Sequence, residues 1–262
     1  NISGEQMGEE FFDFVYNEHG SIEAVVKKTG VPKKQLQELR ASFNYWYPND
    51  HRHTFTLHLS NHLSFMIFAH VAAFEKKYWP KKISFHGLII SEGAKMSKSK
   101  GNTVTLLDVQ NEYGADTFRS FLCAGTSVES TMNWERGKVE QYRTHLVTLF
   151  SMIETAIAHS KKGSIRETWF LSAFERAKKT ATSAIQRMDL RTYATTVLYE
   201  MYSLYKKVSR YATEGEMAVI NQVMMSDWIR MLSPLIPHVA EELWEKSGQN
   251  GFVSLAKWPS ID

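Results

Sequence analysis

Two lysines stand three residues apart in the run Lys95-Met96-Ser97-Lys98-Ser99-Lys100-Gly101-Asn102. An ammonium group on a flexible stem can reach a phosphate, so Lys95 and Lys98 could both bind one polyanion. The serine hydroxyls and the backbone N–H groups near the glycine could donate further hydrogen bonds to phosphate oxygens. This suits activation by ATP, because attack on the α-phosphate builds negative charge that positioned cations stabilise. The lysine pair by itself leaves open a second interpretation, a flexible basic loop without a ligand.

The neighbouring segments predict that this run is a loop between a strand and a helix. Residues 83 to 90 are rich in β-branched and aromatic residues, which favours a strand. Residues 106 to 113 predict a helix that ends at Gly114, and residues 115 to 123 predict a second helix. The order of helix, strand, loop and helix is typical of an α/β layer.

Helical patterns precede the strand. Residues 9 to 46 predict short helices, broken at Gly20 and Gly30, that form a helical connector. From residue 57 to residue 74 apolar side chains recur at helical spacing, so we expect one long helix that is mostly buried.

Strand patterns vanish from about Asn133 onward. Apolar residues then recur at helical spacing in four stripes, at residues 139 to 153, 169 to 188, 197 to 208 and 219 to 232. Four long amphipathic helices with short polar joints predict a helix bundle. The expected fold class is therefore α/β followed by all-α, with one domain over residues 1–134 and a second over residues 135–262.

Composition narrows the class of protein. A hydrophobic content of 43% and an aromatic content of 13% suit two globular domains. The sequence has neither a long apolar run nor a signal peptide, and its single cysteine, Cys123, excludes an internal disulfide, so we expect a cytoplasmic protein. One cysteine also excludes a cysteine-based zinc site in this segment, and we expect no metal site. The net charge of +3 is too small to indicate a nucleic-acid partner, because phosphate affinity depends on local clusters.

The whole run from Lys95 to Asn102 resembles the K-M-S-K-S signature of class I aminoacyl-tRNA synthetases letter for letter, including the Lys-Gly-Asn that follows. Other segments resemble the archaeal-type leucyl branch of this family, and together they cover nearly the whole chain: Tyr45-Trp46-Tyr47-Pro48, Arg52-His53, Asn61-His62-Leu63, Gly114-Ala115-Asp116 with Arg119, Ser233-Pro234, Pro237-His238, residues 251 to 256, and Trp258-Pro259. The resemblance implies the second half of a Rossmann-like class I synthetase catalytic domain with its KMSKS loop. An anticodon-binding helix bundle would follow it.

The resemblance also implies an activity. The full-length protein would be an ATP-dependent leucine–tRNA ligase, which activates leucine as an adenylate, with Mg²⁺ accompanying ATP, and transfers it to tRNA(Leu). Lys95 and Lys98 would be catalytic, while Met96, Ser97 and Ser99 of the loop, together with Asn61 and His62, would bind ATP. The bundle would contact the sugar and phosphate groups of tRNA through its exposed cations, for which the candidates are Arg136, Arg143, Arg187, Arg191, Lys206, Lys207 and Arg210.

The chain departs from the family in the run from Thr54 to Leu59, where two replacements bear on nucleotide binding. Where archaeal leucyl enzymes show a glycine and an acidic residue after the Arg-His pair, this sequence has Phe55 and Leu57. In that register a ring and an apolar side chain stand where close approach and hydrogen bonding are expected, which would compromise ATP binding.

The segment also contains neither the His-Ile-Gly-His-type motif nor the editing insertion of the family. Because the His-Ile-Gly-His-type motif acts together with the KMSKS loop on one ATP, we expect the segment alone to be inactive. The N-terminal half of the enzyme would come from the same longer chain or from a separate polypeptide. Two alternatives stay open: a degenerate paralogue that keeps only tRNA binding, and a synthetase for isoleucine, valine or methionine.

Overall fold

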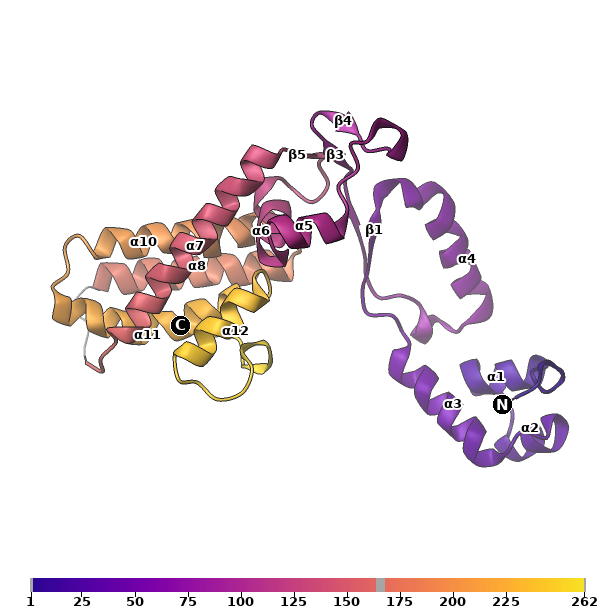
Figure 1. The fold of residues 1–262 in the computed structure, drawn as a ribbon. Helices are drawn as coiled ribbons and strands as arrows, with labels where there is room; N and C mark the ends of the chain where they lie inside the picture. Colours follow the sequence, from indigo (N-terminus) through magenta and orange to yellow (C-terminus); the bar gives the residue numbers. More distant parts are fainter. Residues whose placement is uncertain (1, 164–167, 262) are drawn as a thin grey trace. The chain divides into compact units, whose positions relative to one another are not determined.

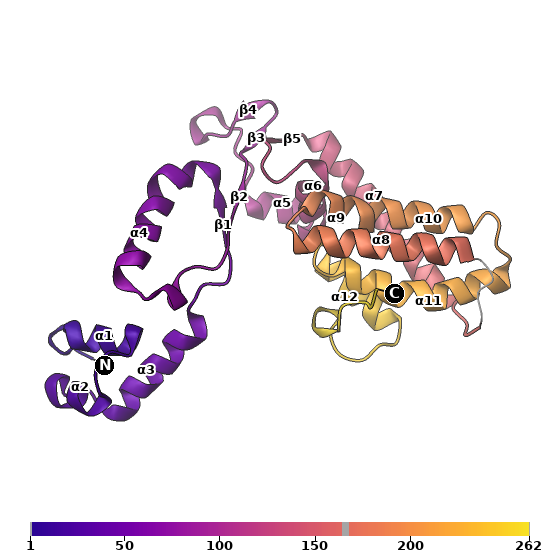
Figure 2. The same ribbon diagram turned by 180° about the vertical axis from the view of Figure 1, so that it is seen from behind.

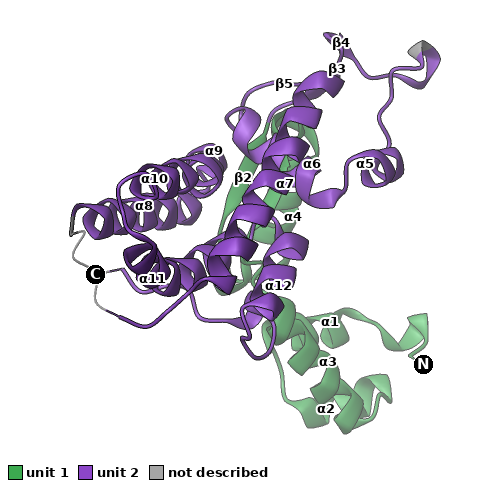
Figure 3. Cartoon of the chain, turned by 60° about the vertical axis from the view of Figure 1, so that its left-hand side comes forward, with its two compact units in different colours: residues 1–86 green, residues 87–262 purple. Residues whose placement is uncertain are grey.

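The computed structural model describes residues 2–163 and 168–261. Its contacts divide the chain into two compact units, residues 1–86 and residues 87–262, which Figure 3 shows in different colours. The domain boundary expected between residues 134 and 135 is a different division, and it stays a prediction.

The first unit begins with three short helices around a small apolar core. Ser21 caps the second helix by accepting a hydrogen bond from the N–H of Ala24, and Gly30 ends it with a φ of 69°. The buried guanidinium of Arg40 donates to the carbonyl of Val15 at 2.6 Å, which ties the first and third helices together. The three helices are α1 (Glu9–Asn17), α2 (Ile22–Thr29) and α3 (Lys33–Trp46), and their core consists of Phe11, Val15, Val25, Val31 and Leu36. The helical connector expected from the sequence is thus confirmed.

A strand, a helix and a second strand complete the first unit. Strands β1 (Arg52–Phe55) and β2 (Ile83–His86) are parallel, with Arg52 opposite Ile83. Parallel neighbours need a crossover, which α4 (Ser64–Ala73) provides after the π-helical turn Leu59–Leu63.

The expected helix is present in this crossover, but the expectation that it is mostly buried is wrong for the described residues. Phe65 and Phe68 of α4 are 74% and 71% exposed, and Leu57 just before it is 67% exposed. A sheet of two strands is too small to cover so broad an apolar face.

The second unit starts with a small sheet that carries the lysine run. Strand β3 (Ile89–Ser91) pairs antiparallel with β4 (Ala94–Lys95) and parallel with β5 (Met132–Trp134). The single strand expected over residues 83 to 90 is divided at Gly87. The N–H of Gly87 donates to the carbonyl of Val128 at 2.7 Å, and a Cβ at this position would lie 2.7 Å from the carbonyl oxygen of Glu129. Only glycine tolerates so close an approach of two backbones.

Helices follow, as the sequence indicated, and form most of the second unit. Among the residues that the structure describes, four long helical segments build the bundle, one of them interrupted by a π-helical turn, and α8 and α10 lie side by side (Figure 1 and Figure 2). The bounds of the helices are α5 (Leu106–Glu112), α6 (Ala115–Gly125), α7 (Arg136–Ala158), α8 (Thr168–Gln186), α9 (Leu190–Thr195) continued through the π turn Thr196–Glu200 into α10 (Met201–Val208), α11 (Glu214–Leu232) and α12 (Pro237–Lys246). The order of a small α/β region and then helices confirms the expected fold class.

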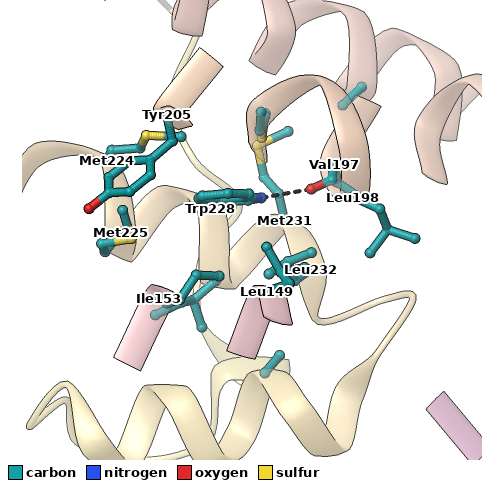
Figure 4. Close-up of a cluster of buried hydrophobic side chains, with 14 of the residues drawn as sticks. Leu149, Ile153, Val197, Leu198, Tyr205, Met224, Met225, Trp228, Met231 and Leu232 are labelled. Carbon is teal, nitrogen blue, oxygen red and sulfur yellow. Dashed lines mark hydrogen bonds between the residues drawn. The ribbon is translucent and has the colours of Figure 1, made fainter. Parts of the chain in front are cut away.

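Trp228 lies at the centre of the bundle core and is fully buried. Its indole N–H donates to the carbonyl of Val197 at 2.8 Å, as the dashed line in Figure 4 shows. The next carbonyl, that of Leu198, accepts a hydrogen bond of 2.8 Å from Nε2 of His145. Both carbonyls belong to the π turn, where the regular ladder of helical hydrogen bonds is interrupted. Side chains from two other helices therefore donate the hydrogen bonds that these two carbonyls of the turn accept.

Asp116 joins two segments that are more than a hundred residues apart in the sequence. Its carboxylate is buried in α6 and accepts hydrogen bonds from the backbone N–H of Val239 at 2.8 Å and from Nδ1 of His238 at 3.0 Å. Arg119 donates to the same carboxylate and also to the carbonyl of Leu235 at 3.1 Å. This network fixes the start of α12 against α6.

We expect Asp116→Asn to lower the free energy of unfolding by about 2 kcal/mol, because one amide N–H would face a donor in a buried site. Urea unfolding followed by circular dichroism measures this loss. Glu200→Gln, which removes the same charge at an exposed position, is the control. If the two variants unfolded at the same urea concentration, the network would contribute nothing to stability.

Candidate functional site

The lysine run forms the loop between β4 and α5. Lys95 is the last residue of β4 and pairs with Ile90 of β3. A short 3-10 turn, Lys98–Lys100, follows, and Gly101 ends it with a φ of 65° and an N–H donated to the carbonyl of Lys98 at 3.2 Å. The strand, loop and helix order that the sequence predicted is confirmed.

Two charged side chains of this loop, those of Lys95 and Lys98, face solvent. Lys95, Lys98 and Ser99 are exposed, and Ser97 is half-buried. Within residues 2–163 and 168–261 neither Lys95 nor Lys98 forms an ion pair with a carboxylate. Two unneutralised ammonium groups on one short loop provide what a polyphosphate requires.

Met96 anchors the loop to the unit below it. Its half-buried side chain packs against an apolar cluster made by helices α5, α6 and α7 and strand β5, whose buried members are Val109, Phe121, Met132, Trp134 and Val139. Val104, just beyond the loop, packs against the same cluster. Met96 therefore holds the loop in place, and its expected contribution to ATP binding stays a prediction.

Asn102 is a residue of the loop to which the sequence analysis assigned no role. Its Oδ1 accepts a hydrogen bond from the N–H of Ser97 at 2.9 Å, and its Nδ2 donates to the carbonyl of Lys95 at 3.2 Å. The signal that could have revealed it is the Gly-Asn pair itself, because asparagine side chains often bond nearby backbone groups in turns.

Asn61 and His62 lie in the first unit, in the π turn that precedes α4. Both side chains are exposed. Arg52 of β1 donates to Nε2 of His62 at 2.6 Å, and the Asn61 side chain accepts a hydrogen bond from the N–H of His62. These contacts connect the turn to β1. The expected roles of both residues in ATP binding stay predictions, since the lysine loop belongs to the other unit.

The two positions that depart from the family lie at the end of β1. Phe55 ends the strand in an extended conformation, and its ring stacks on His86 with centroids 5.7 Å apart. Leu57 follows in an exposed position. The backbone at Phe55 does not demand a glycine in this conformation, so the ring is tolerated by the strand itself.

Histidines gather beside this strand end. His51 and His53 both form hydrogen bonds of 2.7 Å with the Ser84 hydroxyl, and the rings of His53 and His86 lie 5.0 Å apart. Burial lowers the pKa of His53 below its ordinary value, and the neighbouring His86 and His51 lower it further. His53 is therefore neutral near pH 7, as a hydrogen-bonded imidazole rather than a cation.

The candidate tRNA contacts of the bundle are all exposed, but they do not form one patch. Arg191 stands at the start of the helix that runs from α9 into α10, and Lys206 stands near its end. Fifteen residues separate them, about 22 Å along a helix axis. Arg136 and Arg143 belong to α7, where their guanidinium groups lie 4.0 Å from Glu112 and 3.4 Å from Glu140, respectively.

Aromatic rings accompany the cations at the end of α10. Nζ of Lys206 lies 5.8 Å from the ring centroid of Tyr202, and Nζ of Lys207 lies 5.5 Å from that of Trp169. Tyr211, next to Arg210, is 74% exposed. Cations beside exposed rings can bind phosphates and stack on unpaired bases.

Within the part of the chain that the structure describes, no three side chains of histidine, cysteine, aspartate or glutamate are arranged to hold a metal ion. No helix in that same part has the length and apolar character needed to span a bilayer.

Two families match the chain. Residues 30–135 match the family described as tRNA synthetases class I (I, L, M and V). Residues 167–262 match the anticodon-binding domain of tRNA ligase. The first match contains the lysine loop, and the second contains most of the bundle.

Curated relatives align with almost the whole chain. A leucine–tRNA ligase of Staphylothermus marinus is 40% identical over 268 residues, which cover 100% of this chain and 28% of that protein. A leucine–tRNA ligase of Pyrococcus horikoshii is 35% identical over 271 residues, which cover 98% of this chain and 28% of that protein. The chain thus spans little more than a quarter of the length of these relatives.

Two solved structures have the same fold. LeuRS of Agrobacterium radiobacter K84, in a ternary complex with tRNA and LeuAMS, matches with a TM-score of 0.69 and 23% identity over 82% of this chain and 29% of that chain. Methionyl-tRNA synthetase of Mycobacterium tuberculosis, in complex with methionyl-adenylate, matches with a TM-score of 0.66 and 16% identity over 87% of this chain and 49% of that chain. At these identities the likeness concerns the fold, and it confirms the expected architecture.

Proposed function

The chain belongs to the class I tRNA synthetases, and from this premise we propose that it is part of a leucine–tRNA ligase. The complete enzyme uses ATP to activate leucine as an adenylate and transfers the leucyl group to tRNA(Leu). The observation that carries the proposal is the lysine loop, because it presents two exposed ammonium groups on an anchored backbone, neither of them paired with a carboxylate among the described residues. The leucine–tRNA ligases that align with nearly all of the chain favour leucine over the other amino acids of the family.

In this proposal the loop acts on the triphosphate. Lys95 and Lys98 stabilise the charge that develops on the phosphoryl oxygens and on the leaving pyrophosphate. The hydroxyls of Ser97 and Ser99 lie 3.3 Å apart and can donate to phosphate oxygens beside them. Mg²⁺ accompanies ATP and is held mainly by its phosphates, which requires no metal-binding cluster in this segment.

The proposal includes a partner for the first unit. The exposed apolar face of α4, with Phe65 and Phe68, resembles a core surface whose covering layer belongs to another part of the enzyme. Relatives more than three times as long as this chain support the N-terminal half of the catalytic domain as that layer, in the same chain or as a separate polypeptide. The segment alone is then inactive, and we propose that the assembled enzyme is cytoplasmic.

The bundle supplies the contact with tRNA. The cations and rings at the end of α10, above all Lys206, Lys207 and Arg210, favour unpaired nucleotides as their target. We propose that four arginines contact the sugar-phosphate backbone of tRNA: Arg136 and Arg143 of α7, Arg187 just beyond α8, and Arg191 of α9.

One observation favours a second candidate function. Phe55 and Leu57 stand where a glycine and a carboxylate are expected, so a paralogue that binds tRNA without activating an amino acid is the alternative. A synthetase for isoleucine, valine or methionine is a further alternative, because the matching family includes these enzymes.

ATP–pyrophosphate exchange by the intact protein separates these functions. The assay is run with leucine, isoleucine, valine and methionine in turn, and tRNA binding is measured in parallel. We expect exchange with leucine only. Exchange with another of the four amino acids would assign that amino acid as the substrate. Binding of tRNA without any exchange would instead establish the paralogue that binds tRNA without activating an amino acid.

A further inference from the structure

We propose that Asn102 is a positioning residue that closes the lysine loop and so places Lys98 for its action on ATP. This inference rests on the proposed function, because it concerns the same lysine loop and the placement of Lys98 for its action on ATP. Asn102 does not itself reach the reacting atoms in this proposal. It acts through the backbone that carries Lys98.

One side-chain amide makes two hydrogen bonds across the base of the loop. The carbonyl oxygen of the amide accepts from the N–H of Ser97 at 2.9 Å, and its nitrogen donates to the carbonyl of Lys95 at 3.2 Å. Lys95 still belongs to β4, while Ser97 directly precedes the turn that begins at Lys98. The amide therefore ties the end of the loop to the strand at its start.

Among the described residues, the other anchors that hold the loop lie at its two ends. Met96 and Val104 pack against the apolar cluster, and Lys95 is paired in the sheet. Between Met96 and Val104, the backbone bonds found in the described structure are the turn bond from Gly101 to the carbonyl of Lys98 and the two bonds of Asn102. Without the amide, the turn that carries Lys98 could rotate as a piece about its two ends.

The chemistry of this position favours asparagine. The side chain must present an acceptor and a donor at the same end, which asparagine does and aspartate does not. Gly101, with its φ of 65°, turns the chain back so that the amide reaches the strand. Fixed placement matters because a charge that stabilises a transition state loses much of its effect when it is displaced by about 1 Å.

A double-mutant cycle tests the coupling of Asn102 to Lys98 in the intact protein. The readout is the rate of leucine-dependent ATP–pyrophosphate exchange in the native protein, Asn102→Ala, Lys98→Ala and the double variant. We expect Asn102→Ala to lower the rate about tenfold, as two lost hydrogen bonds permit, and Lys98→Ala to lower it much less in the Asn102→Ala background than in the native one. Losses that multiply independently would overturn the proposal, because they would show that Asn102 does not act through Lys98.

Two further variants sharpen the cycle. Asn102→Asp keeps an acceptor for the N–H of Ser97 but cannot donate to the carbonyl of Lys95, so we expect a loss of rate in this variant as well. Asn111→Ala is the matched control, since it removes the same amide from an exposed position on α5. We expect it to exchange like the native protein, and an equal loss in this control would contradict a specific role for Asn102.

Hydrogen exchange of the backbone provides a readout that does not require activity. In the intact protein without nucleotide, we expect the amide of Ser97 to exchange faster in Asn102→Ala, and not in Asn111→Ala, because its acceptor is lost. An unchanged rate would overturn the closure of the loop by Asn102. If the native protein showed no ATP–pyrophosphate exchange, the proposed function and the positioning of Lys98 would both fail, whereas hydrogen exchange would still decide whether Asn102 closes the loop.

Discussion

Lys98→Ala in the intact protein is expected to lower leucine-dependent ATP–pyrophosphate exchange by about 10²- to 10³-fold, the usual effect of removing one group that stabilises transition-state charge. The ammonium group of Lys98 is exposed on the loop and has no carboxylate partner among the described residues, so its charge is available to the triphosphate. The affinity for tRNA should change by less than about twofold, since the proposed action of this ammonium group is on the triphosphate and not on tRNA.

Two comparisons show whether the loss of exchange in Lys98→Ala is specific to the triphosphate. Lys27→Ala removes the same charge from an exposed position on α2 and should leave both measurements unchanged. Equal losses of exchange and of tRNA binding in Lys98→Ala would show that the residue contributes to the general stability or charge of the protein and not to the triphosphate.

Trp228→Ala is expected to lower the free energy of unfolding by about 3–5 kcal/mol, the range for removing a large aromatic side chain from a packed core. The indole is 0% exposed and lies among residues of several bundle helices. Its loss would also leave the carbonyl of Val197 without the 2.8 Å hydrogen bond that it now accepts.

Urea unfolding followed by circular dichroism measures this effect. Trp228→Phe retains part of the buried ring but loses the N–H donor, so its stability should fall between those of the native protein and Trp228→Ala. Tyr211→Ala truncates an aromatic side chain that is 74% exposed and should change the stability by less than about 0.5 kcal/mol. A loss of similar size in Tyr211→Ala and Trp228→Ala would mean that burial does not determine the outcome.

Much of the fold could be predicted because the signals are local. Helical spacing of apolar residues identified the bundle helices, and glycines such as Gly30 marked the points where short helices end. The division of one expected strand into β2 and β3 could not be predicted, since it depends on a backbone approach between Gly87 and residues near Ser130. The burial of α4 was predicted wrongly because an apolar pattern shows that a face suits burial, but not which part of a protein covers it.

The candidate site, too, could be predicted only where its chemistry is contained in a local run of sequence. The lysine loop was identified because its chemistry is contained in eight consecutive residues. Asn102 was overlooked, although it belongs to that run, because its role depends on where the loop folds back and not on its residue type. The cations of the bundle were predicted one by one from their helical segments, which do not show that α9 and α10 separate Arg191 from Lys206 and Lys207 by most of a helix length.

The π turn at Thr196–Glu200 leads into α10 without a break in the helix. Such a turn contains one residue more than an α-helical turn and interrupts the regular ladder of helical hydrogen bonds. Trp228 and His145, which belong to two other helices, donate to two carbonyls of the turn. After the turn, Met201, Tyr205 and Val208 of α10 are buried, and Lys206 and Lys207 are exposed. The two helices that hold the turn therefore also fix the direction in which the charges at the end of α10 point.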